Sequence, residues 1–424
     1  MVNINGRLQQ IRELVDAGKY FTINRARQYG KTTTLRALAE MLRDEYYVVL
    51  LDFQTFDNEK FSNGNVFSVA FAGSFLRVLR RNCKTMNNEM ASVIDEMRKD
   101  ADYANRYFSL KELFEGLSDI CEAADRKIVL MIDEVDSAAN NQVFIDFLAQ
   151  LRAQYLDREF YPGFQSVILA GVYDIKNLKR KLRPEEGHRY NSPWNIAADF
   201  SIEMSFSESE IAGMLQEYES DHRTGMNISK MSELLYAYTA GYPFLVSRIC
   251  QLMDERVRDE YENLKLVWTE NGFNEAVRIL LAEKNPLFES LVGKICDYPE
   301  LSVMLKTLLF TGRNIAYNPD ETSIDMAQMS GFIKNQNGNV VIANRIFETR
   351  LYNYYLTEAK MQQTEIYKAA LQDKSQFIVN GYLDMERILE RFVVHFQDIY
   401  GESDEKFLEE QGRKFFLLYL KSGI

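Results

Sequence analysis

The chain has 424 residues and a formal net charge of −12, with 46% hydrophobic and 26% charged residues. Its length allows about two to four domains with buried cores, and its acidic excess disfavours a general nucleic-acid-binding surface, because phosphate contacts require clustered Lys and Arg. No run of about 18 apolar residues predicts a membrane span. Four separated cysteines and three histidines lack the spacing of a zinc site or a disulfide framework. We therefore expect a cytoplasmic protein that does not associate with a membrane.

The first 206 residues alternate short β-type runs with helical segments, the pattern of a parallel sheet wrapped by helices. An amphipathic N-terminal helix with Leu8, Ile11 and Val15 on one face precedes the first strand. The expected strands are Tyr20–Ile23, Tyr47–Asp52, Lys127–Asp133, Ser166–Gly171 and Phe200–Met204. The middle three are continuous apolar runs, typical of strands buried on both faces.

A long helical insertion, about residues 60–125, is expected between the second and third strands. In it, Asp95 precedes Arg98 and Lys99 by three and four residues. Residues at this spacing are neighbours on a helix surface, which favours a solvated helix face.

The β signal ends near Ser207, which together with Glu210 has the spacing of a capping box at a helix start. Helices dominate to about residue 310. A hairpin is expected from Gly331 to Ile342, with its turn at Asn335–Asn339, since Asn-Gly is a strong turn signal. We predict four parts: an α/β core (1–206), a helical lid (207–290), a winged-helix-like module (291–358) and a helical segment (359–424).

The first strand leads into a loop that ends in Gly30-Lys31-Thr32, at the start of a helix. A phosphate-binding loop needs this context, because its backbone N–H groups and the positive helix end receive phosphates. Lys31 would neutralise phosphate charge, and the Thr32 hydroxyl would bind Mg²⁺. The expected nucleotide contacts in the loop are Gln28, Tyr29, Gly30, Lys31, Thr32 and Thr33. The alternative is an ordinary strand–turn–helix.

The buried third strand ends in Asp133, and Glu134 follows directly. Ligands of α/β proteins bind at the carboxyl edge of the sheet, where this strand would place both carboxylates. Asp133 would hold Mg²⁺ through water, and Glu134 would polarise a water for attack on the γ-phosphate. Alone, such a strand end also fits the alternative of a capped strand end without a ligand. Paired with the glycine-lysine-threonine loop, it predicts a nucleoside triphosphate site in which Lys31, Asp133 and Glu134 are catalytic.

Several segments resemble those of the bacterial AAA-like ATPases, relatives of the AAA+ and STAND proteins within the additional-strand P-loop class. The segments are "RARQYGKTTTL", "VLMIDEVD", "SVILAGVYDIKNLK", "NSPWNIA", "TAGYPFLVSRIC" and "GFIKNQNGNVVIANRIFETRLYNYYL". The resemblance implies a parallel sheet of order 5-1-4-3-2, an all-α lid, a winged helix, and ATP with Mg as cofactors. It also implies that Pro243 approaches the nucleotide base.

The same family explains why Arg25 stands where the usual loop has its first glycine, since its loops resemble R-x-R-x-x-G-K-T. Arg25 or Arg27 would then lie near the phosphates, or both would face solvent or pair with acids. Less specific candidates follow from the AAA+ resemblance: a sensor at Tyr173 or Asp174, a phosphate contact at Arg248, and an arginine finger at Arg180, Arg183 or Arg189.

The C-terminal segment resembles the first helix of a PD-(D/E)XK nuclease-like domain often fused to this family, with Glu409 or Glu410 near its acidic position. The strands that would carry the metal-binding core of such a nuclease are absent from the sequence, so no nuclease activity is expected.

The leading hypothesis is an ATP-hydrolysing molecular switch. The family resemblance is also compatible with assembly into a homo-oligomer. One alternative is a DNA-binding regulator that uses Lys334 and Arg345 of the winged helix. The other is a regulatory fragment of a nuclease system with weak or no ATPase activity.

Overall fold

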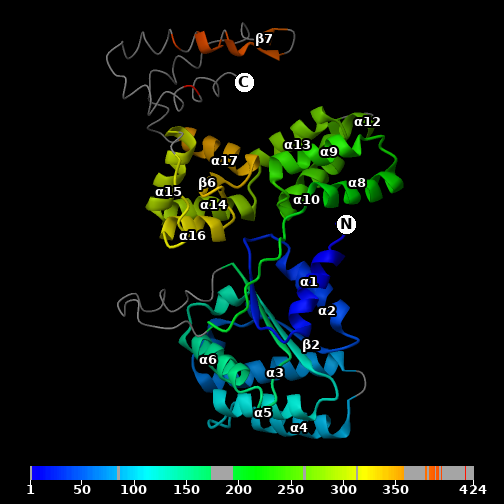
Figure 1. Ribbon diagram of the computed structural model, residues 1–424, viewed down its shortest axis with the longest axis vertical. Coiled ribbons are helices and arrows are strands. Elements are labelled where there is room, and N and C mark those ends of the chain that lie inside the picture. Colours follow the sequence, from blue (N-terminus) through cyan, green and yellow to red (C-terminus); the bar gives the residue numbers. More distant parts are fainter. Residues whose placement is uncertain are drawn as a thin grey trace. The chain divides into compact units, whose positions relative to one another are not determined.

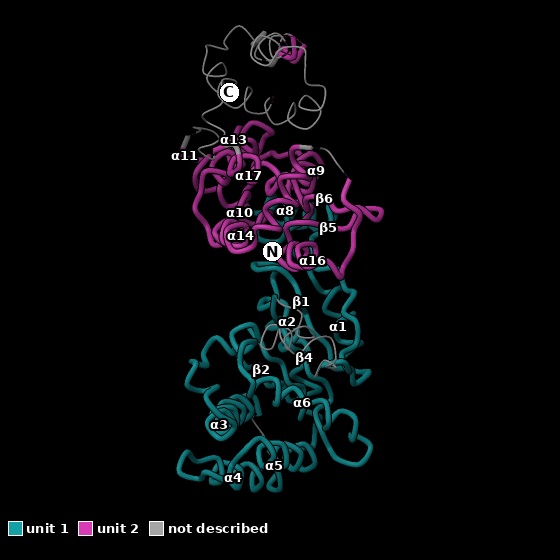
Figure 2. The backbone as a smooth tube through the Cα atoms, turned by 90° about the vertical axis from the view of Figure 1, so that its left-hand side faces the viewer, with its two compact units in different colours: residues 1–221, 242–244 teal, residues 222–241, 245–424 magenta. Residues whose placement is uncertain are grey.

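The computed structural model describes residues 2–83, 86–172, 194–260, 264–311 and 314–357, together with a few residues beyond 377. The chain divides into two compact units (Figure 2). Unit 1 comprises residues 1–221 and 242–244, and unit 2 comprises residues 222–241 and 245–424. Unit 1 therefore extends beyond residue 206, where we placed the end of the α/β core.

Unit 1 is an α/β unit around one parallel sheet (Figure 1). Its elements are α1 (Asn5–Asp16), β1 (Phe21–Asn24), α2 (Lys31–Leu42), β2 (Tyr47–Asp52), η1 (Phe53–Thr55), η2 (Asn58–Phe61), α3 (Gly64–Asn82), α4 (Asn88–Asp100), α5 (Leu110–Ala123), β3 (Ile128–Asp133), η3 (Val135–Ala138), α6 (Gln142–Leu156), β4 (Ser166–Gly171) and α8 (Glu208–His222). The strand order is β1-β4-β3-β2. The first four expected strands are thereby confirmed, within one residue at each end.

The fifth expected strand, Phe200–Met204, is wrong: this segment is irregular. The parallel bridge to β1 that the structure describes here joins Phe21 to Ala198, two residues before the segment. The segment's backbone carbonyls accept hydrogen bonds from arginine side chains instead of from a neighbouring strand. Arg25 donates to the Ile202 carbonyl at 2.8 Å, and Arg7 donates to the Glu203 carbonyl at 2.7 Å. The segment therefore lies beside β1 without joining the sheet as a strand.

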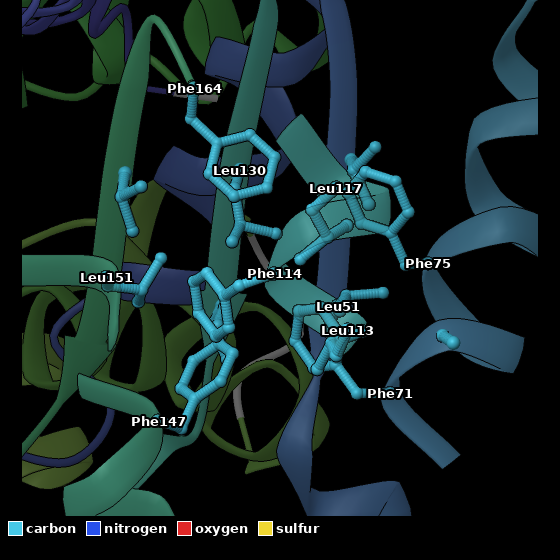
Figure 3. Close-up of a cluster of buried hydrophobic side chains, with 14 of the residues drawn as sticks. Leu51, Phe71, Phe75, Leu113, Phe114, Leu117, Leu130, Phe147, Leu151 and Phe164 are labelled. Atoms are coloured by element: carbon cyan, nitrogen blue, oxygen red, sulfur yellow. The ribbon is translucent and has the colours of Figure 1, made fainter. Parts of the chain in front are cut away.

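Alternate strand residues face opposite sides of the sheet and build two cores. On one side, Val48 and Met131 pack with residues of α1 and α2, including Leu8 and Leu38. The other side holds the larger core, which is rich in phenylalanine. Figure 3 shows part of it: Leu51, Phe71, Phe75, Leu113, Phe114, Leu117, Leu130, Phe147, Leu151 and Phe164. The two packed faces hold the ends of the strands in register, with Asp52 of β2 opposite Asp133 of β3.

The expected insertion between β2 and β3 consists of η2, α3, α4 and α5, which cover the phenylalanine-rich side of the sheet. The face of α4 that carries Asp95, Arg98 and Lys99 is exposed, as predicted. The carboxylate of Asp95 pairs with Arg80 of α3, so α3 and α4 are tied by an ion pair between helices.

Unit 2 is mostly helical. Its elements are α9 (Ile228–Thr239), α10 (Pro243–Leu252), η6 (Met253–Val257), α11 (Arg258–Glu260), α12 (Leu264–Val267), α13 (Glu270–Ala282), α14 (Pro286–Asp297), α15 (Pro299–Lys306), η7 (Thr307–Thr311), α16 (Thr322–Met329), β5 (Ile333–Gln336), β6 (Asn339–Ile342), α17 (Arg345–Leu356), β7 (Ile378–Val379) and β8 (Tyr382–Leu383). The first two residues of α10 belong to unit 1.

The expected hairpin of unit 2 is confirmed as β5 and β6, but its turn is shorter than predicted. Gln336 pairs with Asn339, so Asn337 and Gly338 form a two-residue turn, and both have positive φ, 53° and 80°. Type I′ turns need positive φ at both central residues, which Asn-Gly provides. A third segment joins this hairpin, because the Val340 N–H donates to the Ile315 carbonyl at 2.8 Å.

Beyond residue 357, β7 and β8 form an antiparallel pair where we expected helix. Glu409 and Glu410 lie outside the described residues. Among the helices that the structure describes, none has the length and apolar character needed to span a membrane.

Candidate functional site

The loop from β1 to α2 is shaped by two residues in the left-handed region. Gln28 has φ 57°, and Gly30, the residue that caps α2, has φ 79°. A side chain at such a φ costs roughly 1–2 kcal/mol, which glycine avoids. The glycine of Gly30-Lys31-Thr32 thus allows the backbone reversal that starts α2. Gln28 and Thr33 are exposed, while Tyr29 and Gly30 are half-buried.

Lys31 is buried inside this loop, with 6% of its surface exposed. Its ammonium group donates to the carbonyls of Arg25 at 2.9 Å and Ala26 at 3.0 Å. Burial lowers the pKa of Lys31, and the nearby carboxylates of Glu134 and Asp136 oppose this effect. The loop therefore wraps around a positive charge at the start of α2, the arrangement needed to receive an anion.

A hydrogen bond of 2.6 Å joins the loop to the end of β3: the Thr32 hydroxyl donates to the Asp133 carboxylate. The two residues are 101 positions apart in sequence. Asp133 is 4% exposed, and its other carboxylate oxygen accepts from the Glu134 N–H at 3.0 Å. A hydroxyl and a carboxylate oxygen are ligands that suit Mg²⁺, which takes few protein ligands and completes its shell with phosphate oxygens and water.

Glu134 follows β3 in a left-handed conformation, with φ 53°. Burial raises the pKa of its carboxyl group, and the charge of Lys31 counteracts this rise. Within the described part of the chain, no donor makes a hydrogen bond to this carboxylate. Glu134 is thus the acidic group of the site that is available to orient a water.

Asp136 is a member of the site that the sequence reasoning missed. Its carboxylate accepts a hydrogen bond of 2.6 Å from the Val172 N–H, just beyond β4. Its negative charge also acts on Lys31. The signal was present, because Asp136 stands three residues after Asp133 in the same acidic run.

Tyr242 is a second residue missed from the sequence. Its hydroxyl donates to the Arg27 carbonyl at 2.5 Å, and its ring meets the Tyr29 ring edge-on, with centroids 4.6 Å apart. Tyr29 in turn shares a 2.6 Å hydrogen bond with the Ser205 hydroxyl. The predicted residue Pro243 is the neighbour of Tyr242 and begins α10.

The guanidinium of Arg25 is directed at the irregular segment beside β1. It donates to the Ile202 carbonyl at 2.8 Å and lies over the Phe200 ring, 5.4 Å from its centroid. These contacts are made to a backbone carbonyl and a ring, and the charge of Arg25 also helps to lower the pKa of Glu203. The proximity of Arg25 to the phosphates stays a prediction. Arg27 is exposed, and its charge lowers the pKa of Lys31.

Arg248 forms an ion pair with Glu283 inside unit 2, and its expected phosphate contact stays a prediction. The remaining candidates lie outside the described residues: Tyr173, Asp174, Arg180, Arg183 and Arg189.

Comparison with known proteins places these features in context. A family model described as the AAA-like domain matches residues 5–358. Among solved structures, a Walker-type ATPase of Pyrococcus abyssi is similar, with 13% identity, coverage of 83% of this chain and 96% of that chain, and a TM-score of 0.56. Cdc6p of Pyrobaculum aerophilum gives 13% identity, 84% and 95% coverage and a TM-score of 0.38. No curated protein sequence matches the chain.

Proposed function

The chain belongs to the AAA-like domain family, and we propose that it is an ATP-binding molecular switch that hydrolyses ATP with Mg²⁺. The observation that carries the proposal is the hydrogen bond from Thr32 to Asp133. It joins a hydroxyl at the start of α2 to a carboxylate at the end of a buried strand, and both are groups that nucleoside triphosphate sites use around Mg²⁺. The similarity in fold to a Walker-type ATPase agrees with this proposal.

In this proposal, the phosphates of ATP bind the backbone N–H groups that begin α2. The ammonium of Lys31 turns from the two loop carbonyls toward the β- and γ-phosphates. Mg²⁺, when bound, supplies charge neutralisation at the phosphate oxygens, and Thr32 and Asp133 would hold it. Glu134 orients a water and accepts its proton, so that the water oxygen bonds to the γ-phosphorus and ADP leaves.

The other parts of the chain take regulatory roles in this proposal. We assign residues 207–290 to a lid and residues 291–358 to a winged-helix module, with the β5–β6 hairpin as its wing. We assign the irregular segment that follows the bridge from Phe21 to Ala198 to the place of the fifth strand in the order 5-1-4-3-2. Assembly into homo-oligomers fits a switch of this class, and no nuclease reaction is part of the proposal.

The alternative function, binding of duplex DNA by the wing, has weaker support. The guanidinium of Arg345 lies over the Tyr238 ring, 4.2 Å from its centroid, within unit 2. Lys334 is exposed on β5. With Arg345 occupied, this hairpin offers little of the clustered positive charge that DNA phosphates require.

The test measures ATP binding and turnover with Mg²⁺ for the parent chain and for Lys31→Ala. We expect Lys31→Ala to weaken ATP binding by about 100-fold or more, since a buried charge-assisted contact to phosphate is lost. Arg36→Ala is the matched control, because it removes a cation from an exposed position of the same helix. Equal binding of labelled ATP by Lys31→Ala and the parent would show that the nucleotide site lies elsewhere.

A further inference from the structure

A cavity of about 540 Å³ lies in unit 1 between η1, η2, α3 and the end of α4, and none of the candidate nucleotide-site residues lines it. Volumes of this size accommodate small-molecule ligands. Its lining residues are Thr55, Phe56, Lys60, Val69, Ala70, Gly73, Ser74, Arg77, Arg98, Ala101, Asp102 and Tyr103. No step of the proposed ATPase reaction uses this cavity.

The charge of the lining is positive although the whole chain is acidic. Lys60, Arg77 and Arg98 supply three cations against the carboxylate of Asp102. In the described part of the chain, neither Arg77 nor Arg98 has an ion pair or a side-chain hydrogen bond. Asp95 is the acid that sequence spacing places beside Arg98, and it pairs with Arg80 instead. Two exposed arginines thus line one cavity, and neither is engaged by another described side chain.

The rest of the lining is suited to an organic group. Buried Phe56 and Val69 and the half-buried Ala70 give the cavity an apolar part. Tyr103 stands at the side of Lys60, whose ammonium lies 5.4 Å from its ring centroid. A guanidinium binds a phosphate through paired N–H donors, and an aromatic or aliphatic surface beside it favours a ligand with an apolar body.

Gly73 keeps this cavity open. It stands in the interior of α3, where glycine costs about 1 kcal/mol relative to alanine. No described atom outside its own helix lies within 4 Å of the position that a Cβ would take there. Packing therefore does not require a glycine at this exposed position, and a larger side chain would enter the cavity.

We propose that this cavity is a binding site for a small molecule that carries a dianionic phosphate on a compact apolar body. Arg77 and Arg98 would bind the phosphate, Lys60 would add charge, and Phe56 with Val69 would contact the apolar body. The site is separate from the loop that contains Lys31, and its occupation does not depend on ATP.

A short path connects the cavity to the acidic end of β3. Phe56, a lining residue, packs against Phe53 of η1, with ring centroids 4.9 Å apart. The Phe53 carbonyl accepts a hydrogen bond of 3.0 Å from the Ser137 hydroxyl, and the Ser137 N–H donates to the Glu134 carbonyl at 3.1 Å. A ligand that shifts Phe56 would therefore move the segment that carries Glu134. This regulatory consequence rests on the proposed ATPase function.

The experiment measures binding of phenyl phosphate and of inorganic phosphate to the full chain carrying Lys31→Ala, which removes phosphate binding at the loop. Calorimetry gives the affinity, and hydrogen exchange locates the protection. We expect phenyl phosphate to bind more tightly than inorganic phosphate and to protect residues 55–77 and 98–103. Adding Arg77→Glu or Arg98→Glu should weaken binding at least about tenfold. Gly73→Leu should block it without any change of charge.

The matched controls are Arg81→Glu on α3, for Arg77, and Lys99→Glu on α4, for Arg98. Both residues are exposed and do not line the cavity. Thermal melting confirms that each variant is folded. Absence of phenyl phosphate binding, or equal loss in the control variants, would overturn the site. Unchanged ATP turnover of the parent chain at saturating phenyl phosphate would overturn the regulatory path. Absence of any ATP turnover would count against the proposed function and leave the binding result intact.

Discussion

The loop before α2 and the segment after β3 form the two sides of the candidate site, and they are held in place differently. Asp133 ends a strand that is buried along its whole length, and its position follows from the register with β2. The loop has no strand register to support it, and several of its contacts come from residues far away in sequence. Arg25 bonds the Ile202 carbonyl, 177 positions on, and Tyr242 bonds the Arg27 carbonyl across 215 positions.

This difference indicates that the strand side of the site is held rigidly, whereas the conformation of the loop side depends on its tertiary contacts. The position of the end of β3 is set by the sheet and its two cores. The loop depends on contacts from the irregular segment beside β1 and from Tyr242, next to the start of α10. Changes on the strand side should therefore affect chemistry with little effect on stability, whereas changes at the loop supports should affect stability and binding.

The largest effect is expected for Glu134→Gln on the strand side. The amide cannot accept a proton from water, so turnover should fall by about 100-fold or more, while ATP binding and the free energy of unfolding stay close to the parent values. Because burial raises the pKa of Glu134, the turnover of the parent should decline on acidification at a higher pH than an ordinary glutamate would give. Steady-state kinetics across pH, with ATP binding measured separately, checks the loss of turnover in Glu134→Gln and the pH at which the parent loses activity.

Exposed Glu40 on α2 provides the control for this substitution, as Glu40→Gln. Turnover by Glu134→Gln at the parent rate would assign the water to another group, and Asp136 would be the next candidate because its charge also acts on Lys31.

A smaller effect is expected for Arg25→Gly, which introduces the glycine that phosphate-binding loops usually have at this position. This substitution should lower stability and leave ATP binding almost unchanged. The Ile202 carbonyl loses its charged donor, so the free energy of unfolding should fall by about 1.5–3 kcal/mol. Affinity for ATP should stay within a few-fold, because this guanidinium is directed at the segment beside β1. Denaturant unfolding and nucleotide titration measure the two quantities.

Arg27→Gly is the matched change for Arg25→Gly, since it introduces the same backbone freedom at an exposed arginine two residues on. A loss of ATP affinity greater than tenfold in Arg25→Gly, with a stability equal to that of Arg27→Gly, would mean that Arg25 acts on the phosphates.

The strand side could be predicted from the sequence, because burial on both faces restricts each position of the strand to apolar residues. The run from Ile128 to Ile132 is apolar throughout, and the carboxylate that follows it, Asp133, stands out against it. The capping box at α8 was equally readable, because its signal is local. The Ser207 N–H donates to the Glu210 carboxylate at 2.8 Å, and the Glu210 N–H donates to the Ser207 hydroxyl at 3.2 Å.

The contacts of the loop side could not be predicted as well from the sequence, because the residues that bond to the loop are brought there by tertiary structure. Phe200–Met204 has the composition of a strand, yet Arg7 and Arg25 donate hydrogen bonds to its carbonyls. No local sequence pattern indicates that these side chains take the place of a neighbouring strand. The segment containing Tyr242, "TAGYPFLVSRIC", was identified by its family resemblance, and within it Gly241 and Pro243 form a Gly-x-Pro pattern. That pattern draws attention to the proline, whereas the hydroxyl that bonds the loop belongs to the residue before it.

The smallest effect is expected for Tyr242→Phe, which removes one hydroxyl and keeps the ring against Tyr29. Burial raises the pKa of Tyr242, so the hydroxyl stays protonated at any working pH and donates to the Arg27 carbonyl throughout. Its loss should lower the free energy of unfolding by about 1 kcal/mol and weaken ATP binding by a few-fold, with the turnover rate at saturating ATP unchanged. Tyr236→Phe, at an exposed tyrosine, is the control. If Tyr242→Phe instead lowered the turnover rate and left affinity intact, the support of the loop would be part of the chemical step, and the division between a fixed strand side and a responsive loop side would be wrong.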